Sequence, residues 1–230
     1  MTKTSIHLMA LLMGASLSMA AQAMRFEVRP VADVSPPRAA LVMSGKVDGT
    51  ELRQLKDWME KQPEIDTIIM KNSIGGDAAA GYAVGEYIRD KCLTTGVAGH
   101  CLSSCSRMFL GGKRRFFTEE LPPDKTMVGF HGNYRSDGSL RTERLYTLKR
   151  WVMKYMDWSD EQRSKYEPLV DQWVITPNRQ GFMYFFDETK FKTEDGASVI
   201  YCTGSEPRQQ RLAVCERKRD VSAREIGVIK

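Results

Sequence analysis

A serine pair and a histidine, each near the end of a predicted strand, are the residues of this sequence best suited to nucleophilic chemistry. Ser103 and Ser104 stand between an apolar strand predicted at 93–97 and a helix, whose first free N–H groups can stabilise a developing oxyanion. Outside the N-terminal apolar segment the chain has two histidines, His100 and His131, so a histidine acting as general base must be one of them. Such parts are typical of a nucleophilic hydrolase.

A glycine pair after another predicted strand adds backbone donors to this set. Gly75 and Gly76 end the segment 72–76, Asn-Ser-Ile-Gly-Gly, and a glycine lets a substrate approach the backbone N–H groups closely. Each feature alone has a plainer explanation, since a serine before a helix is most often an N-cap and a Gly-Gly pair is most often a turn. Their order along the chain is what favours the chemical interpretation.

Apolar runs separated by helical patterns predict the elements that must position these residues. Alternating strands and helices form a parallel sheet with crossover helices, which presents reactive groups at the carboxyl ends of its strands. The expected fold class is therefore α/β, with the serines and the histidine at the same end of the sheet. The predicted buried strands lie at 39–43, 65–70, 93–97 and 127–131.

The C-terminal part of the sequence predicts helices and then a small β appendage. Ser159 and Gln162 form a capping box that begins a helix, which Pro168 is expected to interrupt or restart. Residues 191–230 are expected to form a β hairpin followed by a basic, solvated tail. Aromatic residues do not interleave with these charges and the net charge of +5 is mild, so no nucleic-acid partner is expected.

Residues 1–23 are predicted to be a removable secretory signal. A single lysine precedes an apolar stretch that ends in Ala-Gln-Ala, the small-x-small pattern that signal peptidases accept. The stretch is shorter than the roughly 20 residues that cross a bilayer. The mature chain is expected to begin at about Met24 and to work in the periplasm or as a secreted protein. Its composition suits one soluble domain at 24–190 with the 191–230 appendage.

The five cysteines matter because that compartment is oxidising and favours disulfides. Cys202 and Cys215 flank a turn-rich stretch and are candidates to close a hairpin. Cys101 and Cys105 can pair with each other, or one of them with Cys92, and the sequence leaves the connectivity open. An odd number of cysteines leaves at least one thiol unpaired within a monomer.

The order of the motifs resembles the Clp peptidase (ClpP) family of the ClpP/crotonase-like superfamily. Family members carry a strand ending in Asn-Ser-x-Gly-Gly, then Gly-x-x-x-Ser with a glycine nine residues later and a basic residue soon after. A strand ending in histidine follows. The glycine four residues before the serine and the glycine nine residues after it both select Ser103 over Ser104. The resemblance covers roughly residues 38–133. The matching residues are 72–76, Gly99, Ser103, Gly112, Arg115 and His131.

The resemblance implies a serine peptidase and assigns roles to these residues. Ser103 would be the nucleophile and His131 the general base. Backbone N–H groups of Gly75 or Gly76 and of Ser104 would form the oxyanion hole.

The resemblance does not settle the third member of a triad, and the sequence departs from the family pattern at two places. Asp171 is the best candidate for the acid and Glu167 the next, and a dyad without a carboxylate is the alternative. Ile74 stands where proline is usual. Cys101 and Cys105 bracket the serine in a Cys-x-Ser-x-Cys pattern, which looks more like exported relatives of ClpP than the cytosolic enzyme.

The expected function is that of an exported, ClpP-like serine peptidase acting on short or unfolded peptides. The family implies a homo-oligomer, but no ATP-driven unfoldase is expected outside the cytosol. The main alternative is a catalytically inactive binding or scaffold protein of the periplasm. A crotonase-type acyl-CoA enzyme is disfavoured because coenzyme A is cytosolic, and a serine–lysine peptidase would need a base such as Lys113. A metal site at His100, Cys101 and Cys105 is disfavoured by the crowding of its ligands, so neither a metal nor another cofactor is expected.

Overall fold

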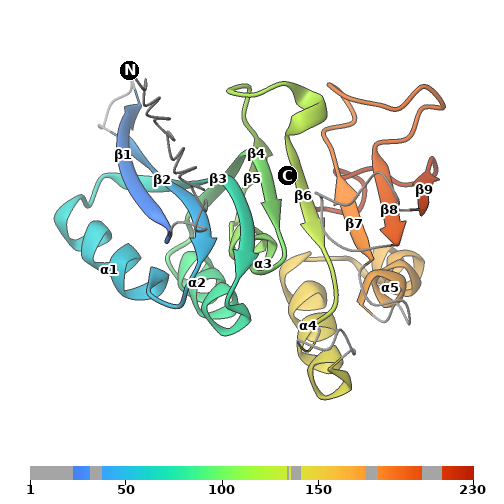
Figure 1. Ribbon diagram of the computed structural model, residues 1–230, viewed down its shortest axis with the longest axis horizontal. Helices are drawn as coiled ribbons and strands as arrows, with labels where there is room; N and C mark the ends of the chain where they lie inside the picture. The colour runs from blue at the N-terminus through green and yellow to red at the C-terminus, as the bar shows by residue number, and fades with distance from the viewer. Residues whose placement is uncertain (1–22, 32–37, 134, 136–140, 175–180, 204–213) are drawn as a thin grey trace, which may run out of the picture.

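The fold is organised around a mixed β-sheet whose path runs β1-β2-β3-β4-β6-β7-β8-β9, with β5 paired beside β4 (Figure 1). This computed structural model describes residues 23–31, 38–133, 135, 141–174, 181–203 and 214–230. The predicted signal at 1–23 therefore lies almost wholly outside the described residues. The strands are β1 Arg25–Val31, β2 Arg38–Val47, β3 Ile65–Gly76, β4 Thr94–Leu102, β5 Arg115–Phe117, β6 Met127–Phe130, β7 Phe182–Phe185, β8 Val199–Thr203 and β9 Val214–Lys218.

The centre of the sheet is parallel, as the alternating sequence pattern predicts. Strands β2, β3, β4 and β6 pair in parallel, whereas β1 and the strands from β7 onward pair antiparallel with their neighbours. The α/β fold class is confirmed. All four predicted strands are present, although β3 and β4 run farther toward the site than the apolar runs indicated. The helices are α1 Glu51–Lys61, α2 Ala78–Asp90, α3 Ser104–Leu110, α4 Thr142–Tyr155 and α5 Asp160–Val174, with a short 3₁₀ turn, η1, at Pro123–Lys125.

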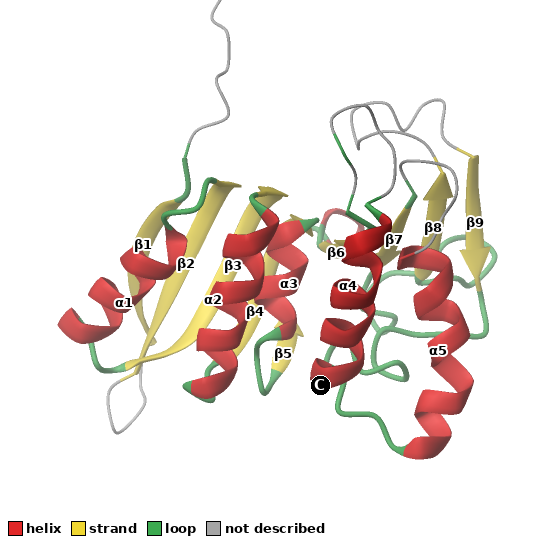
Figure 2. Ribbon diagram, turned by 90° about the horizontal axis from the view of Figure 1, so that it is seen from below, coloured by secondary structure: helices red, strands yellow, loops and turns green. Residues whose placement is uncertain are grey.

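Helices α1 to α5 lie on one face of the sheet (Figure 2). Helices α2 and α3 approach each other closely because α2 carries glycine where they meet. A Cβ on Gly81 would lie 2.5 Å from the carbonyl oxygen of Ser104, and one on Gly85 would lie 2.6 Å from that of Arg107. The two glycines therefore let the short helix that follows the candidate nucleophile sit directly on α2. None of the described helices is both long and apolar enough to cross a membrane.

Helix α5 shows one correct and one wrong prediction. The capping box is confirmed, because the N–H of Ser159 donates to Gln162 Oε1 at 3.1 Å and the N–H of Gln162 donates to Ser159 Oγ at 3.2 Å. The expected interruption at Pro168 is wrong, since the helix continues through that residue. Tyr166 and Val170, on either side of the proline, are buried and hold both halves against the core. Their packing offsets the backbone hydrogen bond that the proline cannot make.

The C-terminal hairpin is present but is continuous with the main sheet. Strands β8 and β9 form it, a Cys202–Cys215 disulfide joins them, and β8 pairs directly with β7. The expected solvated tail is wrong for the last residues, because Ala223, Ile226 and Val228 are fully buried. Apolar residues between the charges anchor this segment to the core.

Arg115 ties the C-terminal segment to the sheet, and its removal is expected to destabilise the fold. Its buried guanidinium donates to the carbonyl oxygens of Leu110, Gly112, Gly227 and Val228 at 2.6–3.2 Å. Arg115→Met leaves these buried acceptors without their donors, so we expect urea unfolding to show a loss of about 3 kcal/mol. Arg53→Met, at an exposed position of α1, should change stability by less than about 0.5 kcal/mol. Equal effects of the two substitutions would contradict this role.

Candidate active site

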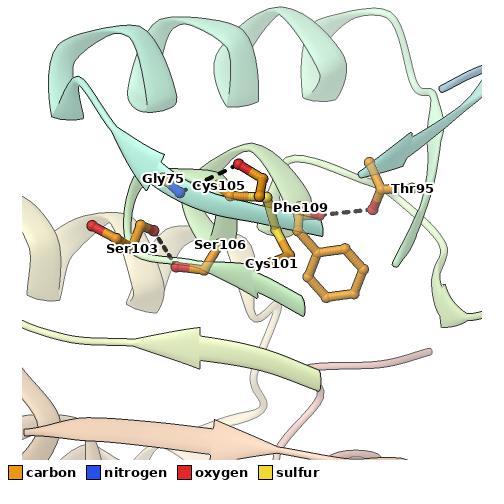
Figure 3. Close-up of a disulfide and its surroundings, with 8 residues drawn as sticks. Gly75, Thr95, Cys101, Ser103, Cys105, Ser106 and Phe109 are labelled. Carbon is orange, nitrogen blue, oxygen red and sulfur yellow. Dashed lines mark hydrogen bonds between the residues drawn. A yellow bond between two sulfur atoms is a disulfide. The ribbon is translucent and has the colours of Figure 1, made fainter. Parts of the chain in front are cut away.

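Ser103 occupies a strained turn between β4 and α3. Its backbone has φ +56° and ψ −124°, a conformation that residues with a side chain rarely adopt. A sharp strand-to-helix turn of this kind holds a serine hydroxyl away from its own backbone, where a substrate can reach it. Two neighbours fix the turn: the N–H of Ser103 donates to the carbonyl of Gly129 at 3.0 Å, and Ser106 Oγ donates to the carbonyl of Ser103 at 2.6 Å (Figure 3).

His131 contacts the serine hydroxyl directly. Its Nε2 lies 2.6 Å from Ser103 Oγ. The sheet explains this contact, because β6 runs parallel to β4 with Leu102 in register with Gly129, so the residues that follow the two strands emerge side by side. The structure thus brings together the serine and the histidine that the sequence analysis selected.

The surroundings of His131 keep its imidazole neutral. The side chain retains some exposed surface, yet burial, followed by the positive charge of Arg107, lowers the pKa of His131 to about 3, against a smaller opposing effect from the backbone of Gly132. The ring packs against that of Phe182, with centroids 4.5 Å apart. A neutral imidazole in the tautomer with the proton on Nδ1 can accept the serine proton at Nε2.

Gly75 is the glycine of the pair that lies against the serine turn (Figure 3). A Cβ at this position would lie 2.7 Å from the Cβ of Ser103 and 2.8 Å from the backbone nitrogen of Ser104. Its N–H donates to Ser73 Oγ at 3.3 Å, a long bond that a better acceptor can replace. Gly76 instead faces β2, where a Cβ would lie 2.0 Å from the carbonyl oxygen of Val47. Gly75, rather than Gly76, therefore lies against Ser103 and Ser104.

A disulfide between Cys101 and Cys105 brackets Ser103. It joins the end of β4 to α3 across a Cα separation of 5.3 Å, and both cysteines are fully buried (Figure 3). This settles the pairing that the sequence left open, with Cys92 remaining as an exposed free thiol. Sulfurs joined to each other are not thiolate ligands, so the disfavoured metal alternative loses two of its three groups. Within the described ranges, no three potential ligands are grouped to hold a metal ion.

Removing this disulfide is expected to lower both stability and nucleophile reactivity. Cys101→Ala with Cys105→Ala frees the turn, so we expect about 2 kcal/mol lower stability and slower modification of Ser103 by a fluorophosphonate. The matched control is Cys202→Ala with Cys215→Ala, which opens the β8–β9 hairpin instead. Urea unfolding and mass spectrometry should show a stability loss in both variants but a reactivity loss only in the first. A wild-type rate in the first would rule out a role for the disulfide in the turn.

Asp171, the candidate third residue, is paired elsewhere. Its Oδ1 lies 2.8 Å from Nζ of Lys149, which also contacts Glu167 Oε1 at 2.8 Å. These ion pairs join α4 to α5, and among the contacts of the described residues no hydrogen bond joins Asp171 to His131. The assignment of Asp171 or Glu167 as the catalytic acid stays a prediction without geometric support.

Arg107 is the site residue that the sequence analysis missed. It is buried on α3, and its Nη2 donates to the carbonyl of His131 and to Asn133 Oδ1, each at 3.2 Å. The guanidinium also lies over the Tyr82 ring, 5.4 Å from its centroid. The sequence did contain one indication of its role, namely a charged residue four positions after the serine in a helical segment that is otherwise largely apolar.

Because the pKa of His131 is low, we expect the reactivity of Ser103 to change little between pH 5 and pH 7.5. A histidine with the ordinary pKa of 6.5 is about 3% neutral at pH 5, whereas one with a pKa of about 3 is about 99% neutral. Since the neutral form is the base, fluorophosphonate modification of Ser103 should be nearly as fast at pH 5 as at pH 7.5. Circular dichroism at pH 5 controls for folding. A tenfold or larger fall in the rate of the folded protein would contradict the low pKa.

The chain combines an α/β sheet with a serine–histidine pair at adjacent parallel strand ends. No family model matches the chain, and no curated protein matches it. Solved structures with some similarity include a 1510-N membrane-bound stomatin-specific protease mutant in complex with a substrate peptide, with 13% identity over 83% of this chain and 72% of that chain and a TM-score of 0.45. ClpP1 from Listeria monocytogenes has 16% identity over 55% and 76%, with a TM-score of 0.39. A putative enoyl-CoA hydratase from Streptomyces coelicolor A3(2) has 9% identity over 96% and 71%, with a TM-score of 0.41. Likenesses this distant assign no role to any residue of this chain.

Proposed function

We propose that this protein is an exported serine hydrolase that cleaves peptide bonds in short or unfolded peptides. The observation that carries the proposal is the 2.6 Å contact between His131 Nε2 and Ser103 Oγ at a strained strand-to-helix turn. The neutral state of the histidine and the N–H groups of Gly75 and Ser104 beside the serine support the same chemistry.

The proposed reaction needs only groups of this chain and water. Ser103 Oγ attacks the carbonyl carbon of the substrate while its proton passes to Nε2 of His131. The carbonyl oxygen becomes an oxyanion that accepts hydrogen bonds from the N–H groups of Gly75 and Ser104. His131 then gives the proton to the leaving amine, and an acyl ester remains on the serine. Water, deprotonated by His131, attacks the ester carbonyl; the bond to Ser103 Oγ then breaks, the histidine returns the proton to that oxygen, and the acid is released.

Electrostatics explain when the histidine can carry a proton. Burial and Arg107 disfavour the imidazolium in the free site, and the negative charge of the oxyanion stabilises it once the tetrahedral intermediate forms. The proton transfer is therefore favoured only when a carbonyl substrate occupies the site. This coupling suits a hydrolase whose serine stays protonated between turnovers.

The N-terminal segment supports the proposed location and substrate class. Residues 1–23 carry the pattern of a secretory signal, and the two disulfides suit an oxidising compartment. Outside the cytosol no ATP-driven unfoldase delivers folded proteins, so the proposed substrates are short or already unfolded. Assembly into a homo-oligomer belongs to the same proposal.

Hydrolysis of unfolded protein tests the proposed function. Mature wild-type protein should release new amino termini from reduced, alkylated casein, and Ser103→Ala should abolish the release. Ser159→Ala, which removes a helix cap at the start of α5, is the matched serine control and should retain activity. Absence of cleavage of casein, short peptides and activated esters by folded wild-type protein would count against a hydrolase.

A binding or scaffold function is the second candidate. It is favoured by the ion pairing of Asp171 with Lys149, which leaves that acid in a structural role between two helices. Under this alternative, Ser103→Ala would bind unfolded peptides as tightly as wild type and would rescue a deletion strain equally well. Failure of that variant to rescue, together with intact peptide binding, would exclude it.

A further inference from the structure

Arg107 links the two halves of the candidate site through one side chain. It stands on α3, the helix that begins directly after Ser103, and reaches the segment that follows β6. There its Nη2 donates to the carbonyl of His131 and to Asn133 Oδ1, each at 3.2 Å. The helix that carries the serine turn is thereby joined to the backbone of the histidine itself.

A contribution to fold stability does not by itself explain why the buried residue at position 107 is charged. Only 1% of the residue is exposed, and its guanidinium contacts a carbonyl, an amide oxygen and the ring of Tyr82, which are all neutral. Within the described part of the chain its Nε has no hydrogen-bond partner. A buried charge without full compensation costs stability, and apolar residues of similar volume commonly replace such groups without loss. The following residues of α3, Met108 and Phe109, are of that apolar kind.

The contact between Arg107 and His131 restrains a part of the site that the sheet itself does not hold. His131 lies just past the end of β6, where sheet pairing no longer restrains the backbone, since the last paired residue is Phe130. The ring needs a defined position, because proton transfer depends on the 2.6 Å separation between Nε2 and Ser103 Oγ. Two contacts that restrain this segment are the hydrogen bond from Arg107 to the carbonyl of His131 and the packing of Phe182 on the ring.

We propose that Arg107 is a positioning residue for the reaction, whose guanidinium holds the segment 131–133 against α3 so that the His131 ring stays in contact with Ser103. This role rests on the proposed hydrolase function for its catalytic consequence, but the positioning itself can be measured without catalysis. Arg107 touches neither the hydroxyl nor the ring nitrogen in the structure and so acts through the histidine.

The charge of Arg107 has a second effect on the same histidine, which supplies a specific readout. Arg107 brings a positive charge to His131 from α3, while Phe182 brings an uncharged ring from β7 and Gly132 its backbone. Since the positive charge disfavours the imidazolium, its removal should raise the pKa of His131. The acidic limb of the reactivity profile should then move to higher pH.

Arg107→Met and Arg107→Lys, with Arg89→Met as matched control, test the proposal. Arg89 also lies over a tyrosine ring and donates to two backbone carbonyls, but at the far ends of α3 and α4. Fluorophosphonate modification of Ser103 is measured from pH 2.5 to 8.5, at the pH values where circular dichroism shows folded protein. Arg107→Met should lower the plateau rate tenfold or more and move the acidic limb upward. Arg107→Lys should keep the limb near its wild-type position and recover part of the rate, and Arg89→Met should change neither.

Hydrogen exchange separates failure of the positioning role from failure of the proposed function. Exchange of the amides at 131–133 should quicken in Arg107→Met and not in Arg89→Met, whether or not the serine reacts. If wild-type Ser103 is inert but this exchange difference appears, the hydrolase proposal fails and the positioning role stands. Wild-type exchange and reactivity in Arg107→Met, or equal effects of Arg89→Met, would overturn the inference. If Arg107→Met does not fold, a wild-type plateau and wild-type exchange in Arg107→Lys would overturn it equally.

Discussion

His131→Ala is expected to lower the rate of fluorophosphonate modification at Ser103, and of any peptide hydrolysis, by about 1,000-fold. The residue supplies the only imidazole shown in contact with the serine hydroxyl among the described residues, at 2.6 Å. Without it the serine must lose its proton to water at neutral pH, which is slow because an isolated serine hydroxyl is a weak nucleophile. Mass spectrometry of the intact protein over time gives the rate directly.

The matched control for that substitution is His100→Ala. His100 lies within β4, in register with Met127, and burial lowers the pKa of His100 as it does that of His131. Loss of His100 removes a partly buried imidazole near the same strand end without removing the proposed base. We expect its rate to stay within about threefold of wild type. Equal losses in the two variants would show that the effect of His131→Ala is structural.

Gly75→Ala should produce the second large effect, a loss of about 100-fold or more in the same rate. The added methyl group would lie 2.5 Å from the carbonyl oxygen of Leu102 and 2.7 Å from the Cβ of Ser103, so the serine turn or the glycine strand must shift. Either shift moves the N–H of Gly75 from the place where the oxyanion forms, and loss of one such donor costs 100- to 1,000-fold in well-studied hydrolases.

Gly196→Ala controls for backbone strain in this comparison. Gly196 has φ +86°, close to the +83° of Gly75, but a Cβ there would meet nothing within 4 Å. Both substitutions strain a left-handed backbone, and only Gly75→Ala adds the contact with the serine turn. We expect Gly196→Ala to lose some stability and to keep the wild-type rate. A wild-type rate in folded Gly75→Ala would remove that glycine from the proposed oxyanion hole.

That a serine and a histidine would meet at one end of the sheet was predictable from the strand pattern, whereas the choice of Ser103 and His131 came from the resemblance to the Clp peptidases. Apolar runs mark buried strands, parallel strands end at the same side, and polar residues just after them meet there. The sequence pattern did not predict that Gly75, and not Gly76, lies against the serine turn, since this depends on which neighbour each glycine faces. The strain at Ser103 was equally hidden, because the residue type gives no sign of a positive φ at that position.

Other parts depended on contacts between segments far apart in the chain. Pro168 was expected to break a helix by a local rule, yet burial of Tyr166 and Val170 outweighs the lost hydrogen bond. The buried C-terminal segment follows from carbonyl groups that meet Arg115 more than 100 positions earlier. Arg107 was missed because its partners lie on a neighbouring strand end, which a single-sequence pattern does not indicate.

The position of a covalent adduct shows whether Ser103 is a nucleophile activated by His131. Mature, oxidised, folded protein is treated with a fluorophosphonate, its intact mass is measured, and the modified peptide is sequenced by tandem mass spectrometry. We expect one adduct per chain, on Ser103, absent from Ser103→Ala and strongly slowed in His131→Ala. An unmodified folded protein, or an adduct that persists in Ser103→Ala, would contradict it.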